Sequence, residues 1–361
     1  MRRPFLNVLA SVLLVGLLNS CREKAPNPEV YELGVIVKNA GNYFDNNGSI
    51  SFLRREKTVA ENDLFFKENG RSFKGGVQDY AEMGGHSLVL VDNSTAGLDN
   101  VEIINFGTWK SEATLGAPDI ENPRSVVGIS PTKAYVSCWG ATGAYPNFFV
   151  NPGYVAIIDL NSFKVVKKIP LPSGAERMVK VGNDVYVGNA DKSKDLVVID
   201  AVTDAVKGNV PIGNQPEPLA LDANGKLWVK TGFTVVRLNP QNFAIEATLP
   251  IGNDPLRTPS NFAIAPDGKG FYFVYSYYDT ATNSNKGETY YFGIDDTKIN
   301  TTKPFVNRTF SGLGVDPLQL LVYGAVTPSY KQAGYVVRYR TDGSLVDSIK
   351  VDIAPTGFMF K

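Results

Sequence analysis

Residues 185–220 of the chain read VYVGNADKSKDLVVIDAVTDAVKGNVPIGNQPEPLA, and this stretch decides the fold. It holds strand-like runs at 185–188, 196–200 and 206–212, each rich in Val or Ile and bounded by Gly, Asn, Asp or Pro. Short β-branched runs between such turn residues are typical of β-strands. A Pro-containing turn at 215–218 then opens the next unit.

The same unit recurs at intervals of about 45 residues, a spacing typical of propeller blades. Consecutive copies start near residues 122, 176, 215 and 259. We expect the unit at 259 to end with a fourth strand at 307–310, and the last unit to open at 317–322 with a shortened first hairpin. Four short strands per unit predict an all-β, seven-bladed β-propeller. A β-sandwich or jelly roll is the alternative, although neither needs a constant four-strand period.

The two ends of the repeat region predict how the ring closes. Residues 355–360 (PTGFMF) look like the first strand of a further blade, after which the chain stops. Residues 33–38 look like a second strand with no first strand before it. Joining the N- and C-terminal strands in one blade removes the sheet edges that an open ring would expose.

The N-terminal segment has the features of an export signal. Arg2 and Arg3 precede an apolar stretch from 5 to 18 that is too short to span a membrane, and Leu18-Asn19-Ser20-Cys21 follows. The motif resembles the lipobox of bacterial lipoproteins, which implies cleavage before Cys21 and lipidation of that residue. An ordinary cleaved signal with a chance cysteine is the alternative. We therefore expect a lipoprotein signal peptide at 1–20, the lipidated cysteine and a tether at 21–30, and the propeller at 31–361.

Composition excludes several function classes. Lys and Arg total 36 and Asp and Glu total 36, without a basic stripe, so nucleic acid is not an expected partner. The one histidine, His86, lies in a predicted tight turn on the face away from the main opening, which argues against catalysis. We expect no cofactor and no metal, and the Asp45–Ser49 segment is interpreted as a hairpin loop, with a carboxylate-only calcium site left open. Cys138 is expected to be a buried, inert thiol.

Several stretches resemble known propellers. YVGN at 186–189, VIDAVTDAVKGNVPIGNQPEPLAL at 198–221 and KLWVKTG at 226–232 resemble the YVTN/YncE type of β-propeller. The stretches at 35–53 and 333–360 resemble a Bacteroidetes lipoprotein family of such propellers, formerly of unknown function. The best understood relatives are surface lipoproteins that capture cobalamin beside an outer-membrane transporter, so the resemblance implies the same class of role.

The predicted site is the mouth of the central channel, where the turns into the innermost strands meet the loops after the second strands. A polar ring with an aromatic rim suits a large, flat, amphipathic ligand. The alternative is that the polar residues cap strands and the aromatic residues fill gaps between blades. The candidate ligand-binding residues are Gln78, Asp79, Arg124, Trp139, Glu176, Arg177, Glu217, Asn261, Tyr275, Tyr277 and Gln319.

The leading hypothesis is a lipid-anchored protein of the outer membrane, facing the cell surface, that binds a small molecule for uptake. The resemblance adds cobalamin as the ligand and a TonB-dependent transporter as the partner. A protein-interaction scaffold of the cell envelope is the alternative. A propeller hydrolase or lyase is the third reading, and the single histidine disfavours it.

Overall fold

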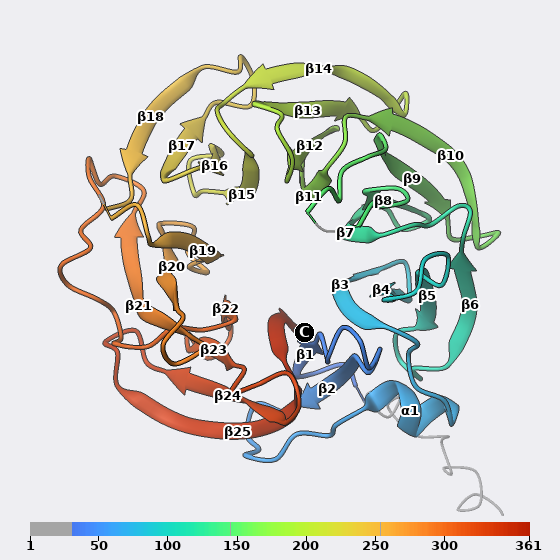
Figure 1. Cartoon of the computed structure of the whole chain (residues 1–361), viewed down its shortest axis with the longest axis horizontal. Helices are drawn as coiled ribbons and strands as arrows, with labels where there is room; N and C mark the ends of the chain where they lie inside the picture. Colours follow the sequence, from blue (N-terminus) through green and yellow to red (C-terminus); the bar gives the residue numbers. More distant parts are fainter. Residues whose placement is uncertain (1–30, 145, 253) are drawn as a thin grey trace, which may run out of the picture.

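The computed structural model describes residues 31–144, 146–252 and 254–361, which form a ring of seven β-sheets around a central axis (Figure 1). The seven-bladed β-propeller predicted from the repeat is therefore confirmed. The predicted signal peptide at 1–20, Cys21 and the tether at 21–30 lie outside the described residues. Tyr145, an aromatic residue of the loops expected around the channel mouth, lies outside them as well. Among the residues described, no helix has the length and apolar character needed to cross a membrane.

The blades are numbered here in chain order, and in each the innermost strand lines the axis. Blade 1 contains β26 (Pro355–Phe360), β1 (Val35–Asn39) and β2 (Ser49–Leu53). Blade 2 contains β3 (Gly76–Met83), β4 (His86–Asp92), β5 (Asn100–Asn105) and β6 (Ser111–Gly116). Blade 3 contains β7 (Pro123–Ser130), β8 (Lys133–Cys138), β9 (Gly153–Asp159) and β10 (Lys164–Leu171). Blade 4 contains β11 (Ala175–Val181), β12 (Asp184–Asn189), β13 (Asp195–Asp200) and β14 (Ala205–Pro211).

The remaining blades complete the ring. Blade 5 contains β15 (Glu217–Leu221), β16 (Leu227–Thr231), β17 (Thr234–Leu238) and β18 (Ile245–Pro250). Blade 6 contains β19 (Thr258–Ile264), β20 (Gly270–Asp279) and β21 (Ser284–Gly293). Blade 7 contains β22 (Gly312–Val315), β23 (Val322–Val326), β24 (Ala333–Tyr339) and β25 (Leu345–Ile353).

The two ends of the described chain share blade 1, as the sequence predicted. The C-terminal β26 pairs antiparallel with the N-terminal β1, from Val35 opposite Phe360 to Asn39 opposite Pro355. The last strand thereby supplies the innermost position of blade 1, next to β1. Both edges that would otherwise be open are paired, which is how a ring avoids unpaired backbone groups.

Residues 307–310 do not form the fourth strand predicted for blade 6. The sheet stops at β21, and just before this segment Val306 forms an isolated antiparallel bridge with Thr289 in place of a ladder. The hydroxyl of Thr289 also donates to the carbonyl of Arg308 at 2.8 Å. Phe310 is buried between blades 6 and 7 instead of lying along the outer edge. The apolar residue that suggested a strand is therefore used to fill an interface.

Residues 317–322 do not open blade 7 either. Its innermost strand is the short β22, and 316–321 form the turn into β23. β22 contains Gly312 and Gly314, residues that are depleted in strands, so its sequence gave no strand signal. The structure requires them: a Cβ at Gly312 would meet the carbonyl of Thr356, and one at Gly314 would lie 2.9 Å from the ring of Phe360.

The core consists of seven apolar clusters, one between each pair of neighbouring blades. Alternate residues of a strand serve different interfaces, because side chains alternate across a sheet. In β8, Ala134 and Val136 pack toward blade 2, whereas Tyr135 packs toward blade 4. Both faces of the middle strands are thus buried, which explains their continuous apolar sequences.

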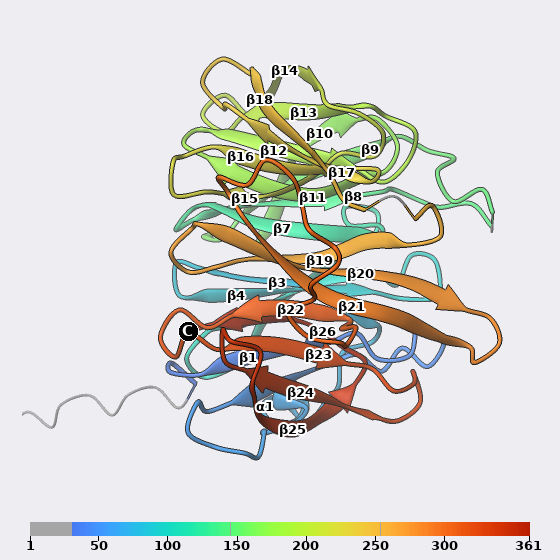
Figure 2. The same cartoon turned by 90° about the vertical axis from the view of Figure 1, so that its left-hand side faces the viewer.

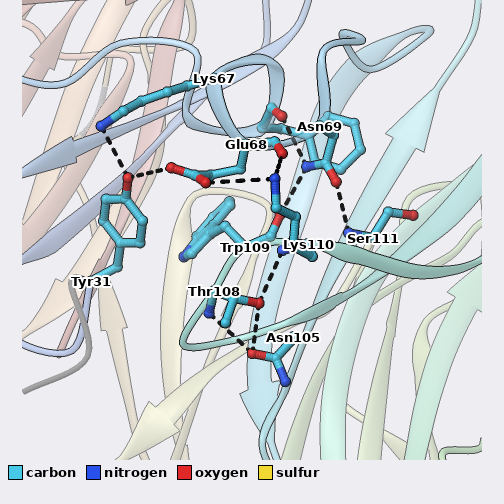
Figure 3. Close-up of polar contacts among 10 residues, drawn as sticks. Tyr31, Lys67, Glu68, Asn69, Asn105, Thr108, Trp109, Lys110 and Ser111 are labelled. Atoms are coloured by element: carbon cyan, nitrogen blue, oxygen red, sulfur yellow. Dashed lines mark hydrogen bonds and ion pairs between the residues drawn. The ribbon is translucent and has the colours of Figure 1, made fainter.

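A short helix, α1 (Leu64–Asn69), covers the outer side of blade 1, which lacks a fourth strand. Leu64 and Phe65 are buried, and Phe65 stacks on Phe73 with ring centroids 4.2 Å apart. Figure 3 shows the polar contacts of this helix with Tyr31 and with the β5–β6 turn. Asn69 donates to the carbonyl of Trp109 and accepts from the amide of Ser111. These bonds fix the helix to blade 2.

The two faces of the ring differ. We call the face where the innermost strands begin the channel mouth; the β8–β9 loop and the β20–β21 hairpin project from it, on the right of Figure 2. The C-terminal residue lies on the opposite side (Figure 2). Tyr31 lies on that opposite side as well, because it precedes Val35, which pairs with Phe360 near the C-terminus.

Candidate ligand-binding channel

The central channel contains a cavity of about 810 Å³ that is reached from the channel mouth. Residues from the innermost strand of every blade line it. This volume lies in the range of sites that hold a small organic ligand. The charged side chains in its lining are Lys38, Asp79, Arg124, Glu176, Arg177, Glu217 and Lys230.

Backbone irregularities place these side chains in the channel. The pairing of the innermost strand with the second strand shifts register between Val77 and Asp79 in blade 2 and between Ala175 and Met178 in blade 4. Blades 3, 5 and 6 have comparable shifts near the start of their innermost strands. A bulge bends the strand and re-aims its side chains, so residues that would otherwise face a neighbouring blade turn toward the axis.

Side chains of one blade satisfy backbone groups of the next. Asp79 accepts from the amide of Val126 at 3.0 Å, which links blade 2 to blade 3. Arg177 donates to the carbonyl of Leu219 at 3.0 Å, which links blade 4 to blade 5. Asp79 also pairs with Lys38 at 2.7 Å. The charged residues therefore hold the inner ring together as well as lining it.

Arg124 lies between two carboxylates. Its guanidinium is 3.3 Å from Asp92 and 3.5 Å from Glu176. It also lies over the indole of Trp139, 4.0 Å from the ring centroid, a cation–π contact. The indole Nε1 of Trp139 donates to Glu176 at 2.9 Å. Trp139 thereby fixes the positions of two charged groups in the channel.

A second charged group spans blades 4 and 5. Glu217 is 3.5 Å from Arg177 and 3.4 Å from Lys230. The Arg177 side chain is 40% exposed, more than any other charged side chain for which an ion pair in the channel is described. Both cations line the cavity, and Arg177 is the more exposed of the two.

Burial changes the acidity of the carboxylates near Arg124. Desolvation raises the pKa of Asp92 to about 6, and the positive charge of Arg124 only partly opposes this effect. The second side-chain oxygen of Asp92, Oδ1, has no hydrogen-bond partner among the described residues. Desolvation likewise raises the pKa of Glu176, against the opposing influence of Arg124. An ionised Asp92 therefore costs folding free energy.

We expect Asp92→Asn to stabilise the protein at pH 7 and not at pH 4. The pKa of Asp92 is raised to about 6 in the folded protein, whereas in the unfolded chain the pKa of an aspartate is about 3.9. The folded state therefore binds more protons between these values, and the unfolding free energy falls as pH rises through them. The variant avoids this fall and should gain about 1–3 kcal/mol at pH 7.

Chemical denaturation at pH 4, 5.5 and 7 measures the effect. Asp159→Asn is the matched control, because hydrogen bonds from Ser162 and Asn161 lower the pKa of Asp159. Its ionised form favours folding, so the control should lose stability above pH 4 and gain none. An Asp92→Asn protein that follows the parent at every pH contradicts the prediction.

The structure brings most of the predicted site residues together in the channel lining. They come from blades 2 to 6, as the repeat predicted. The predicted residues that line the cavity are Gln78, Asp79, Arg124, Glu176, Arg177, Glu217 and Asn261.

Four predicted residues lie elsewhere. Trp139 is beside the channel and contacts it through Arg124 and Glu176. Tyr275 is 2% exposed, and its hydroxyl donates to the carbonyl of Asp254, so it belongs to the core and not to a rim. Tyr277 is exposed on the projecting β20–β21 hairpin, because these strands run longer than predicted.

Gln319 is on the face opposite the channel mouth. The sequence placed it at the start of an innermost strand, but β22 ends before it, at Val315. It lies instead in the turn into β23, where its side chain accepts from the hydroxyl of Tyr323 at 3.1 Å. The displacement follows from the glycine-rich strand that sequence patterns did not reveal.

Sequence reasoning missed two channel cations, Lys38 and Lys230. Each lies in the second strand of its blade near the channel mouth, in an otherwise apolar run. A single lysine late in VIVKN and in LWVKT was the available signal. Asp92, which pairs with Arg124, occupies the corresponding end of β4.

The structure also places the single histidine, the internal cysteine and the loop around Asp45. His86 starts β4 on the face opposite the channel mouth, and its Nδ1 lies 2.6 Å from Glu112. Cys138 is fully buried, and burial raises the pKa of its thiol to about 12. Asn42 and Asn47 close the loop around Asp45 by side-chain hydrogen bonds. Within the described ranges, no three His, Cys, Asp or Glu side chains are grouped so that they could hold a metal ion.

Fold and channel together define a seven-bladed β-propeller with a charged central cavity. The chain belongs to the family described as Domain of unknown function (DUF5074), which matches residues 33–360. A search of curated proteins found no match.

Solved structures share the fold at low sequence identity. A quinonprotein alcohol dehydrogenase-like protein from Bacteroides thetaiotaomicron has a TM-score of 0.61 and 16% identity, over 89% of this chain and 78% of that one. A functionally unknown protein from Desulfotomaculum acetoxidans has a TM-score of 0.61 and 12% identity, over 91% and 98%. Hydrazine synthase from Kuenenia stuttgartiensis has a TM-score of 0.54 and 11% identity, over 78% and 88%. These similarities concern the fold alone.

Proposed function

We propose that this protein is a lipid-anchored envelope protein that binds a small molecule in its central channel and delivers it for uptake across the outer membrane. The observation that carries the proposal is the cavity of about 810 Å³, lined by seven charged side chains from five blades. Burying this many charges costs free energy unless a ligand or a partner residue compensates them. The ion pairs among these side chains are unequal, because Arg177 and Lys230 share the single carboxylate of Glu217, so the lining keeps donors for a ligand.

Cobalamin is the first ligand to test, because of the resemblance to corrinoid-binding lipoproteins. Titration calorimetry of the wild-type protein with cobalamin, followed by fractionated outer-membrane extracts, measures binding. For any ligand found, the Trp139→Ala/Arg177→Ala double variant should bind on the order of a hundredfold more weakly. One substitution removes the group that holds Glu176 and Arg124 in place, and the other removes the most exposed channel cation.

The control for this prediction is Lys207→Ala, which removes an exposed ion pair with Asp184 on blade 4, away from the channel. It should bind like the parent. A folded double variant that keeps full affinity would place the binding site outside the channel. Failure of cobalamin alone would remove only the corrinoid candidate.

In this proposal, a lipid attached to Cys21 anchors the protein to the membrane. Tyr31, the first described residue, lies on the face opposite the channel mouth, so the proposed tether joins the propeller on the face away from the cavity opening. The proposed partner is a TonB-dependent transporter of the same membrane. Cys21→Ala should move the protein from the membrane fraction to the soluble fraction of the envelope. Unchanged membrane association would remove lipidation from the proposal.

A protein-interaction scaffold is the second candidate, because the channel mouth carries a crown of exposed apolar side chains. Exposed apolar side chains on loops of one face are candidates for contact with another molecule. A ligand binder should melt at a higher temperature with the small molecule alone, whereas a scaffold needs its protein partner. The crown consists of Tyr43, Phe44, Leu98, Phe148, Val150, Phe233, Leu256, Tyr277, Tyr278 and Tyr330.

A further inference from the structure

The charges near the channel are balanced as a whole but not locally. Around Arg124 there are two carboxylates, Asp92 and Glu176, for one cation. We call these three residues the acidic group, and its formal charge is +1 − 2 = −1 when both carboxylates are ionised.

The opposite imbalance occurs one blade further on. Arg177 and Lys230 share the single carboxylate of Glu217, at 3.5 Å and 3.4 Å. We call these three residues the basic group, and its formal charge is +2 − 1 = +1. Lys38 and Asp79 form a neutral pair at 2.7 Å and belong to neither group.

The two groups lie side by side. Glu176 and Arg177 are consecutive residues of β11, and both line the cavity. The negative charge of Glu217 contributes to the raised pKa of Glu176, which also indicates that the groups are close. A dipole therefore crosses the cavity wall between blades 3 and 5.

The cations of the basic group have bonding capacity left. Lys230 has three N–H donors, and within the described ranges its ammonium has one hydrogen-bond acceptor, Glu217, at 3.4 Å. The Arg177 guanidinium reaches Glu217 at a similarly long distance and donates to one backbone carbonyl. Ligand anions prefer shorter contacts, of about 2.7–2.9 Å, to such donors.

We propose that the channel takes a zwitterionic ligand, whose anionic group contacts Arg177 and Lys230 and whose cationic group contacts Glu176. This inference rests on the proposed binding function and narrows the ligand class. A ligand of one charge would compensate one group and leave the other uncompensated in a partly desolvated cavity. A zwitterion compensates both. The cavity of about 810 Å³ leaves room for a substantial neutral body as well.

Small probes test each half by nuclear magnetic resonance. Trp139 is one of three tryptophans, and its indole N–H donates to Glu176, so its signal reports on the acidic group. Methylammonium should shift this signal in the parent and not in Glu176→Gln. Acetate should shift the side-chain N–H signal of Arg177, and Lys230→Met should weaken that effect. The control Lys207→Met should leave both responses unchanged.

Linking the two charges tests the zwitterion directly. Unbranched amino acids H₃N⁺–(CH₂)n–COO⁻, from glycine to 6-aminohexanoate, span a range of charge separations. The best-fitting member should saturate both signals at a concentration on the order of tenfold lower than either single ion, because the second contact becomes intramolecular. Its advantage should disappear in Glu176→Gln and in Arg177→Met.

Two results would overturn the proposal of a zwitterionic ligand. One is that no amino acid of the series binds more tightly than acetate and methylammonium. The other is that a ligand found by titration binds the channel equally well in Glu176→Gln and Arg177→Met. In both cases the proposed binding function survives if cobalamin or an extract fraction still shifts the Trp139 signal. If neither cobalamin nor any extract fraction shifts the Trp139 signal, the proposed binding function is itself wrong.

Discussion

A protein that lacks residues 355–361 is expected to lose its native fold. Residues 355–360 form β26, the innermost strand of blade 1 in the described part of the chain. Phe358 and Phe360 pack against Tyr323 of blade 7 with ring centroids 5.7 Å and 5.2 Å away. Loss of a buried phenylalanine typically costs about 3–5 kcal/mol. Phe358 and Phe360 are partly buried, so each contributes less than that, but the deletion removes both and also exposes the edge of β1 along its whole length. The summed cost is therefore comparable to the whole stability of a typical domain, about 5–15 kcal/mol.

Soluble yield and thermal unfolding followed by circular dichroism measure this effect. The matched control removes residues 280–283 at the tip of the β20–β21 hairpin, which is exposed to solvent. It should melt close to the parent, because trimming a solvated loop tip removes no core contact. A truncated protein that melts within a few degrees of the parent would show that β26 does not close the ring.

Asp316→Ala is expected to destabilise the protein by about 3–5 kcal/mol. Asp316 is fully buried after β22 and pairs at 2.6 Å with Arg55, which follows β2. The pair therefore joins blade 7 to blade 1, and Arg55 also donates to the backbone carbonyl of Lys361 at 2.7 Å. Removing Asp316 leaves a guanidinium buried without its carboxylate, which is far more costly than losing an exposed pair.

Urea denaturation of the parent and of three variants distinguishes the cost of leaving a buried charge without its partner from the loss of an ion pair as such. Lys207→Ala breaks a pair of similar length, 2.8 Å, that is exposed on blade 4, and should cost less than about 1 kcal/mol. The double variant Arg55→Met/Asp316→Leu removes both charges and should be more stable than Asp316→Ala alone. If Asp316→Ala costs no more than Lys207→Ala, the buried pair does not hold the closure.

The repeat determined most of the fold because each blade follows the same local rules. Val and Ile runs bounded by Gly, Asn and Pro occur wherever a strand is buried on both faces, so 196–200 and its equivalents could be located from sequence. The rule failed in two places for one reason. Gly312 and Gly314 are selected for close packing against β26, and Phe310 for filling the gap between blades 6 and 7. Contacts with distant residues set these choices, and local patterns do not record them.

For the candidate site, too, some features could be predicted from the repeat and others depend on contacts between blades. The repeat pattern was enough to predict that polar residues such as Asp79, Arg124 and Glu176 recur at the start of innermost strands, and a propeller must bring such positions to one mouth. Which charges meet depends on the three-dimensional packing of the blades. The partners of Arg124 are Asp92 from another blade and Glu176 from the next, and Lys230 reaches the channel from a second strand. Ion pairs depend on distances of a few ångströms between blades, and these are set by the bulges and by closure of the ring, which no single repeat contains.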